Sequence, residues 1–270
     1  MREDLGLAFQ RTHEMGRATL IGYLPAGFPA VDRFCEIVKV AARDGLDILE
    51  IGLPVEDAYL DGPVIRSALQ SLIAQGVTVD RALEMGAEAI HLSEIFGFVM
   101  AYPATIAKYG AERLLKRCKF LGIAGILFVG ASLSEWMEFA QLAQDMGVQP
   151  VGFIGSHADD QTIQLVVKHS KGFLYVQSYD GQTGQRGEFG ESLKDHLQQV
   201  RIYAQTVNSP VAVGFGIQTP DDVHRLLSMG VDGVVVGTAL VKATAEGGSA
   251  VHQLISGLAS AAVLRGHDGE

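Results

Sequence analysis

The sequence predicts an α/β fold, a (β/α)8 TIM barrel with an extra helix at its N-terminus. Eight short apolar runs alternate with helix-like segments, and each run has the length and β-branched content of a buried strand. A chain of 270 residues is long enough for eight such units. Glycine-rich loops follow the last three runs, where barrels often bind phosphate. The alternative, an open doubly wound sheet, would carry a G-x-G-x-x-G loop after an early strand instead.

The predicted strands are near-continuous apolar runs, as expected for a parallel sheet that is covered on both faces. In chain order they are Ala18–Tyr23, Asp47–Gly52, Phe98–Tyr102, Gly125–Val129, Pro150–Ile154, Phe173–Val176, Pro210–Gly214 and Gly233–Val236. No linker or shift in composition divides the chain. We therefore expect one barrel domain over residues 1–270.

Helix-like segments with apolar residues three and four positions apart follow the strands. They lie near residues 30–44, 63–75, 79–94, 105–120, 134–146, 159–170, 191–206 and 219–229, with one long closing helix from 239 to 263. Two of them begin with capping residues, because Ser132 and Thr219 each precede an acidic residue by three positions. An amphipathic stretch, Leu5–Glu14, predicts the extra helix before the first strand.

Composition limits the partners and the location of the protein. Its net charge of -10 disfavours nucleic acid and anionic membranes as partners. No apolar run approaches the roughly 20 residues that cross a bilayer, and the acidic start of the chain does not resemble a signal peptide. Cys35 and Cys118 are far apart in sequence, which indicates reduced thiols. We expect a cytoplasmic protein.

Two carboxylates point to acid/base chemistry. Glu50 lies inside the apolar run Asp47–Gly52, where a carboxylate is costly unless it is paired or used. Asp61 follows on a loop that ends in Gly62-Pro63. Carboxylates in two different environments can divide acid and base roles between them. The structural alternative makes Glu50 a member of an ion pair and Asp61 a helix N-cap, and the pattern alone leaves both interpretations open.

The late glycines predict a site for a small phosphate compound. They lie in three loops: Gly181-Gln182-Thr183-Gly184, Gly214-Phe215-Gly216-Ile217 and Gly237-Thr238-Ala239. Glycine lets the backbone approach a phosphate closely, and free N–H groups at a helix start stabilise its charge. Each glycine could instead serve only a tight turn. Three such loops on consecutive strands favour phosphate binding, and they explain how an acidic protein could hold an anion.

Other chemistries find little support in the sequence. Every lysine falls in or beside a predicted helix, whereas a Schiff-base lyase needs one at a strand end. The eight histidines form no H-x-x-H or H-E-x-x-H cluster, so no metal site is predicted. Neither a Walker motif nor a Ser-His-Asp arrangement is present.

Over nearly its whole length the chain resembles the tryptophan synthase alpha chain family, whose members are (β/α)8 lyases. The most specific match is Leu49–Pro54 together with Leu60–Pro63. Ile21–Pro29 matches at the start of the chain. The family's later signatures match Phe173–Tyr175 and the three glycine-rich loops.

The resemblance implies a lyase that cleaves indole-3-glycerol phosphate to indole and glyceraldehyde 3-phosphate without a cofactor. Glu50 is then the general acid/base, and Asp61 stabilises positive charge at the indole nitrogen. Thr183 would contact the second carboxylate when the site closes. Other matched positions line the substrate pocket (Tyr23, Leu127, Tyr175, Phe215) or bind phosphate (Gly184, Gly216, Gly237, Thr238). The implied partner is a tryptophan synthase beta chain, which would carry pyridoxal phosphate itself.

The chain departs from the family pattern at several positions, and several of these lie on the face that docks the beta chain in the family. The family's loop reads Pro-Phe-Ser-Asp-Pro-Leu-Ala-Asp-Gly-Pro, and here Glu56 adds a charge and Ala58 replaces a proline. The other departures are Ala104-Thr105, Gly130, Ser132, Tyr179 and Asp180. We therefore expect retained lyase chemistry with altered coupling to a beta chain. A stand-alone indole producer, a weakly active homologue that activates another enzyme, and a barrel acting on another sugar phosphate remain alternatives.

Overall fold

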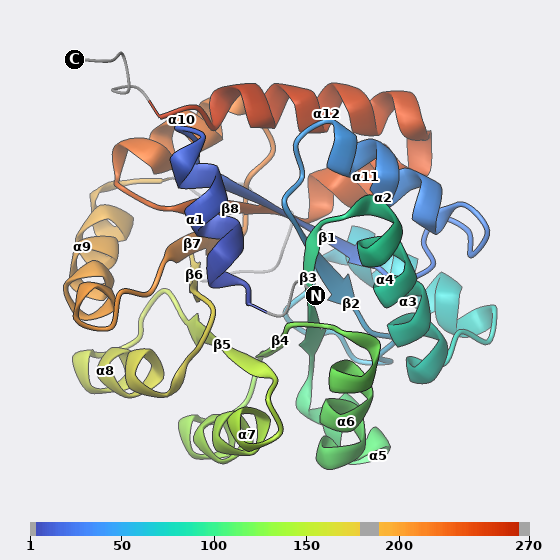
Figure 1. Cartoon of the computed structure of the whole chain (residues 1–270), viewed down its shortest axis with the longest axis horizontal. Helices are drawn as coiled ribbons and strands as arrows, with labels where there is room; N and C mark the ends of the chain where they lie inside the picture. Colours follow the sequence, from blue (N-terminus) through green and yellow to red (C-terminus); the bar gives the residue numbers. More distant parts are fainter. Residues whose placement is uncertain (1–3, 179–188, 265–270) are drawn as a thin grey trace.

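The computed structural model describes residues 4–178 and 189–264 and contains a closed barrel of parallel strands. The strands pair in chain order, and the last pairs with the first (Figure 1). They are β1 (Thr19–Pro25), β2 (Ile48–Gly52), β3 (Phe96–Ala101), β4 (Gly125–Phe128), β5 (Gln149–Ile154), β6 (Leu174–Gln177), β7 (Val211–Gly214) and β8 (Gly233–Val236). The predicted barrel is confirmed, and the open doubly wound sheet is wrong.

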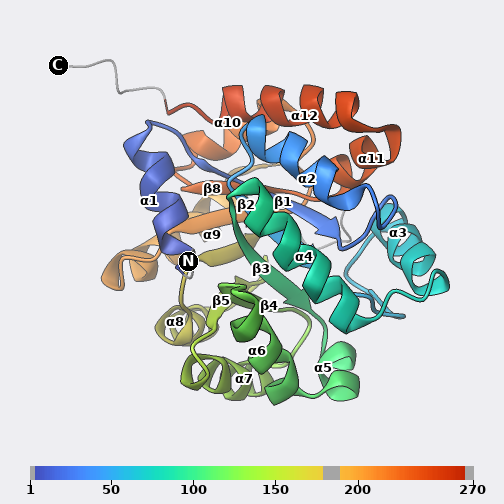
Figure 2. The same ribbon diagram turned by 45° about the vertical axis from the view of Figure 1, so that its right-hand side comes forward.

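Helices surround the barrel on its outside (Figures 1 and 2). They are α1 (Gly6–Glu14), α2 (Phe34–Arg43), α3 (Pro63–Ala74), α4 (Val79–Ser93), α5 (Pro103–Tyr109), α6 (Ala111–Leu121), α7 (Leu133–Asp145), α8 (Asp160–His169), α9 (Glu191–Thr206), α10 (Pro220–Ser228), α11 (Thr238–Glu246) and α12 (Gly248–Ala261). Among the described residues no helix is long and apolar enough to cross a membrane.

The predicted N-terminal helix is α1, and it closes the end of the barrel where the strands begin. Leu5, just before it, is fully buried, and the Phe9 ring lies 5.2 Å from the ring of Phe173. Nearby, Arg17 forms two hydrogen bonds to Asp47, at 2.6 and 2.7 Å between nitrogen and oxygen. Asp47 is thus a structural residue at this end, while the opposite end of the barrel stays accessible.

Two long helices of the prediction are each two helices in the structure. The segment 105–120 divides into α5 and α6 at Gly110, and the closing helix divides into α11 and α12 at Gly247. Both glycines have positive φ, 93° and 113°, which breaks a right-handed helix and suits glycine. The predicted caps are confirmed, because Ser132 and Thr219 each form a capping box with the acidic residue three positions later.

The register brings the C-terminal halves of neighbouring strands together around the barrel axis. Glu50 of β2 lies opposite Tyr23 of β1 on one side and Phe98 of β3 on the other. All five residues of β2 are buried, so Glu50 projects into a solvent-excluded interior. The strands therefore carry their functional side chains to one end, which is where barrels place active sites.

Candidate active site

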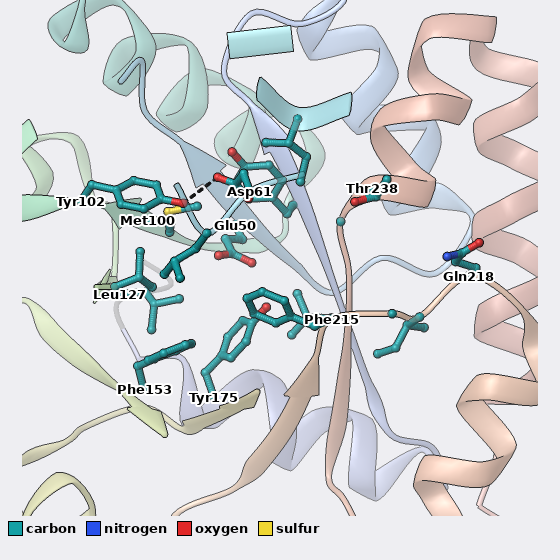
Figure 3. A pocket seen from close by; sticks show the side chains of 18 residues that line it. Glu50, Asp61, Met100, Tyr102, Leu127, Phe153, Tyr175, Phe215, Gln218 and Thr238 are labelled. Carbon is teal, nitrogen blue, oxygen red and sulfur yellow. Dashed lines mark hydrogen bonds between the residues drawn. The ribbon is translucent and has the colours of Figure 1, made fainter. Parts of the chain in front are cut away.

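A pocket lies at the C-terminal ends of the strands, lined by residues of β1 to β6 and β8 and of the loops that follow the strands. Most of the residues predicted to form the site line this pocket: Tyr23, Glu50, Asp61, Leu127, Tyr175, Phe215, Gly216, Gly237 and Thr238. Figure 3 shows Glu50 and Asp61 at one end of the pocket and Thr238 with Gln218 at the other. Thr183 and Gly184 lie outside the described residues. The pocket thus joins an acidic end to a glycine-rich end.

Glu50 is a buried carboxyl that favours its protonated form. Only 3% of the residue is exposed. Burial raises the pKa of Glu50 from its ordinary 4.5 to about 8, and the neighbouring Asp61 carboxylate contributes to the rise. At neutral pH the side chain therefore holds a proton that it can donate inside an apolar pocket.

The ion-pair interpretation of Glu50 is wrong for the part of the chain that the structure describes. Glu50 forms no salt bridge to any described residue, and its Oε2 is buried without a hydrogen-bond partner there. A buried polar atom without a partner is costly and calls for an explanation. A ligand that fills the pocket would provide the missing hydrogen-bond partner.

Asp61 lies in the loop between β2 and α3 and is 2% exposed. The Tyr102 hydroxyl donates a hydrogen bond of 2.8 Å to its Oδ2 (Figure 3). Its own N–H donates to the carbonyl of Ala58 at 2.9 Å. The N-cap of α3 is Gly62, so the alternative that makes Asp61 a cap is wrong. Asp61 is instead held at the pocket by the side chain of Tyr102, the residue directly after β3.

Tyr102 remains a hydrogen-bond donor throughout the physiological range. Burial, together with the negative charge of Asp61 and the hydrogen bond to it, raises the pKa of Tyr102 above its usual range. Its hydroxyl can therefore orient a carboxylate without giving up its proton. Tyr102 was not among the predicted site residues, although an aromatic hydroxyl at the end of a predicted strand was an available signal.

Aromatic rings form the wall between the two ends of the pocket. The ring centroid of Tyr175 lies 5.8 Å from that of Phe153 and 6.3 Å from that of Phe215. The Tyr23 hydroxyl is buried with no hydrogen-bond partner among the described residues. Such a wall suits a flat aromatic ligand that also has hydroxyl groups. Phe153, Met100 and Gln218 also line the pocket and were missed by sequence reasoning.

The glycine-rich end provides groups suited to an anion. Helix α11 begins at Thr238 directly after Gly237, so the N–H groups of its first turn lack intrahelical acceptors, and both residues line the pocket. The Thr238 hydroxyl oxygen is buried and has no partner among the described residues. Gly216, with φ of 80°, brings its backbone to the same end. These donors could bind a phosphate despite the negative net charge of the protein.

Phe215 has a backbone conformation that is rare for a residue with a side chain. Its φ is 78°, and the Ser178 hydroxyl donates to its carbonyl at 2.8 Å. Strain of this kind concentrates at functional sites and persists only where the surroundings hold it. The contact from Ser178 connects the end of β6 to the loop after β7. Sequence reasoning found Phe215 but not this support.

No metal or Schiff-base chemistry is apparent in the described site. The described residues contain no group of three metal-ligating side chains. No lysine is among the residues that line the pocket. The described residues that line the pocket do include the carboxyl groups of Glu50 and Asp61 and the hydroxyl groups of Tyr23, Tyr102 and Tyr175.

The raised pKa of Glu50 predicts a dependence of stability on pH. Glu50 titrates near 4.5 when unfolded and near 8 when folded, so between these values the folded protein binds the extra proton. The stability that the protein gains from this proton on Glu50 is complete below pH 4.5 and is lost as the pH rises through 8. Between these pH values the free energy of unfolding falls by on the order of 1 kcal/mol per pH unit, the value for one bound proton. We expect Glu50→Gln to remove this slope in urea unfolding at several pH values, and parallel curves for the two proteins would contradict the assignment.

Comparisons with known proteins agree with this geometry. The family model described as "Tryptophan synthase alpha chain" matches residues 9–264. The tryptophan synthase alpha chain of Solibacter usitatus is 33% identical over 238 residues, 88% of each chain. That of Prochlorococcus marinus is 32% identical over 234 residues, 87% of this chain and 84% of the relative.

Two solved structures of tryptophan synthase have a similar fold. Tryptophan synthase from Mycobacterium tuberculosis matches with a TM-score of 0.87 and 28% identity, over 98% of this chain and 100% of that chain. A structure from Pyrococcus furiosus, which concerns mutual activation of the tryptophan synthase a2b2 complex, matches with a TM-score of 0.80 and 28% identity, over 91% and 100%. The closed barrel, the pocket at its C-terminal end and these matches lead to one conclusion. This chain belongs to the tryptophan synthase alpha chain family.

Proposed function

We propose that this chain is a carbon–carbon lyase that cleaves indole-3-glycerol phosphate to indole and glyceraldehyde 3-phosphate. The observation that carries the proposal is Glu50, a protonated carboxyl buried in an aromatic pocket opposite Asp61. A group with a pKa near the working pH is suited to general acid/base catalysis. The donors at the other end of the pocket support a phosphate group on the substrate.

In the proposed reaction, Glu50 protonates C3 of the indole ring, and Asp61 stabilises the positive charge that develops on the ring nitrogen. The bond from C3 to the glycerol carbon then breaks, and its electron pair returns to the ring. The adjacent hydroxyl loses its proton with the help of the Glu50 carboxylate and becomes the aldehyde. The proton added and the proton removed balance, so Glu50 ends the cycle protonated. No cofactor is needed for these steps.

Steady-state indole release by the isolated chain tests the proposal. Turnover by the chain alone favours a stand-alone indole producer, and turnover only with a beta chain favours a synthase subunit. Absence of indole under both conditions would overturn the lyase assignment in favour of an activator of another enzyme. Cleavage of a different sugar phosphate would reassign the substrate. In each case we propose a cytoplasmic protein.

We also propose that coupling to a tryptophan synthase beta chain is altered. Two of the departures, Glu56 and Ser132, make contacts inside this chain, whereas Tyr179 and Asp180 lie outside the described residues. Glu56 lies 3.3 Å from the Lys108 ammonium, and Ser132 caps α7 through Glu135. Pyridoxal phosphate would belong to the beta chain and not to this one.

We expect isothermal titration against a beta chain from the same source to show weak binding with little mutual activation. The physical reason is that residues on the expected docking face differ from the family pattern, so the contacts they offer a beta chain differ as well. Tight binding with strong mutual activation would contradict the altered coupling.

A further inference from the structure

We propose that Tyr59 is a positioning residue that holds Asp61 in place through contacts made entirely within this chain. The inference rests on the proposed function, because it assigns the support of one proposed catalytic group. Three contacts, each sharing a residue with the next, carry the inference: Tyr59 to Gly130, Tyr59 to Tyr102, and Tyr102 to Asp61.

The first contact joins two loops that are far apart in the chain. The Tyr59 hydroxyl, in the loop between β2 and α3, donates a 2.8 Å hydrogen bond to the carbonyl of Gly130, after β4. Gly130 has φ of 75°, and a Cβ at this position would collide with the Tyr59 hydroxyl. The missing side chain at 130 therefore makes room for the tyrosine at 59. The two residues fit each other as a pair.

The second and third contacts carry this support to the carboxylate. The Tyr59 ring packs edge-on against the ring of Tyr102, with 5.3 Å between centroids. Tyr102 in turn donates its hydroxyl to Asp61 at 2.8 Å. Within the loop, the Asp61 N–H also donates to the Ala58 carbonyl at 2.9 Å, which closes a turn around Tyr59. A loop held this way keeps Asp61 over the pocket without a second protein.

The ring of Tyr59 should matter more than its hydroxyl. Tyr59 is 42% exposed, so its hydrogen bond competes with water and contributes modestly. Another link between the loop and its neighbours is the pair Glu56–Lys108, whose side chains are 79% and 83% exposed. Exposed ion pairs of this kind contribute little. Lys108→Ala therefore provides a matched control on the same face of the protein.

Hydrogen–deuterium exchange of the isolated chain tests the positioning role without reference to activity. In peptides covering residues 55–62, Tyr59→Phe should raise exchange about two- to tenfold and Tyr59→Ala more, because a looser loop opens more often. Lys108→Ala should leave these peptides unchanged. Tyr203→Phe, which removes a 2.7 Å hydrogen bond to Asp160 on α8, should also leave them unchanged. Unchanged exchange in both Tyr59 variants would overturn the proposal.

A double-mutant cycle then connects the loop to catalysis. Tyr59→Phe should lower kcat about two- to tenfold in the parent chain, with KM nearly unchanged. In the Asp61→Asn background it should cause no further loss, because the negative charge whose position matters for the reaction has been removed. A merely structural role would lower activity equally in both backgrounds, and that outcome would overturn the proposal. An inactive parent chain with faster loop exchange in Tyr59→Phe would reject the lyase function and leave the positioning role intact.

Discussion

Glu50→Gln is expected to fold like the parent chain and to lose about a thousandfold or more of its indole-forming rate, near the upper part of the range for general acid/base groups. The amide keeps the shape of the carboxyl but can neither give a proton to the ring nor accept one from the hydroxyl. The measurement is single-turnover indole release at high enzyme concentration. The effect should appear in kcat, because the interaction is used in the transition state.

The fold should survive this substitution because nothing described depends on the Glu50 charge. The carboxyl is protonated at neutral pH and forms no ion pair with the described residues. Thermal unfolding near pH 7 should occur at a temperature no lower than in the parent, because glutamine avoids the cost of burying a carboxyl that would ionise in the unfolded chain. The matched control is Glu56→Gln, whose carboxyl is on the exposed loop and should leave the rate unchanged. An active Glu50→Gln protein with normal stability would refute the role assigned to Glu50.

The barrel could be predicted from the sequence because its strands differ sharply from their surroundings. Parallel strands covered on both faces are apolar runs, and their number and spacing identify the fold class. Glu50 was recognisable for the same reason, since a charged residue interrupts one of these runs. The glycines in the loops after the last strands predicted the end of the pocket that is suited to an anion, because glycine lets the backbone approach a ligand closely.

The contacts between distant loops could not be predicted in the same way. Tyr102 meets Asp61 over a separation of 41 residues, and Tyr59 meets Gly130 over 71. Neither pairing has a local signature, because the strand register brings these side chains together. The helix breaks at Gly110 and Gly247 were missed for a related reason. A glycine within a helical pattern is often tolerated, and only its φ shows that it ends a helix.

The two carboxyl groups occupy environments that favour different protonation states. The Oε2 of Glu50 has no hydrogen-bond partner among the described residues and the side chain holds its proton, whereas Asp61 accepts a hydrogen bond from Tyr102. The negative charge of Asp61 also contributes to the raised pKa of Glu50. A pair of carboxyls separated in this way can act as an acid and as a stabilising anion. A substitution that removes the Asp61 charge should therefore change the pKa of Glu50.

Asp61→Asn is expected to lower kcat by about a hundred- to a thousandfold, the usual effect of removing one charge-stabilising group. The amide oxygen can still accept the hydrogen bond from Tyr102, so the position of the side chain should persist while its charge is lost. Asp57→Asn, an exposed change in the same loop, is the matched control and should retain the parent rate.

The same variant should also move the pH dependence of the reaction. Burial is the larger cause of the raised Glu50 pKa and Asp61 is the second, so removing the Asp61 charge should lower that pKa while leaving it above 4.5. Because Glu50 must be protonated to act as the acid, activity declines above its pKa, and this decline should begin at lower pH in Asp61→Asn. The measurement is kcat/KM from pH 5 to 9 for both proteins, which reports the free enzyme. A reduced rate with an unmoved pH profile would mean that Asp61 and Glu50 do not sense each other, and that the site does not work as a coupled pair.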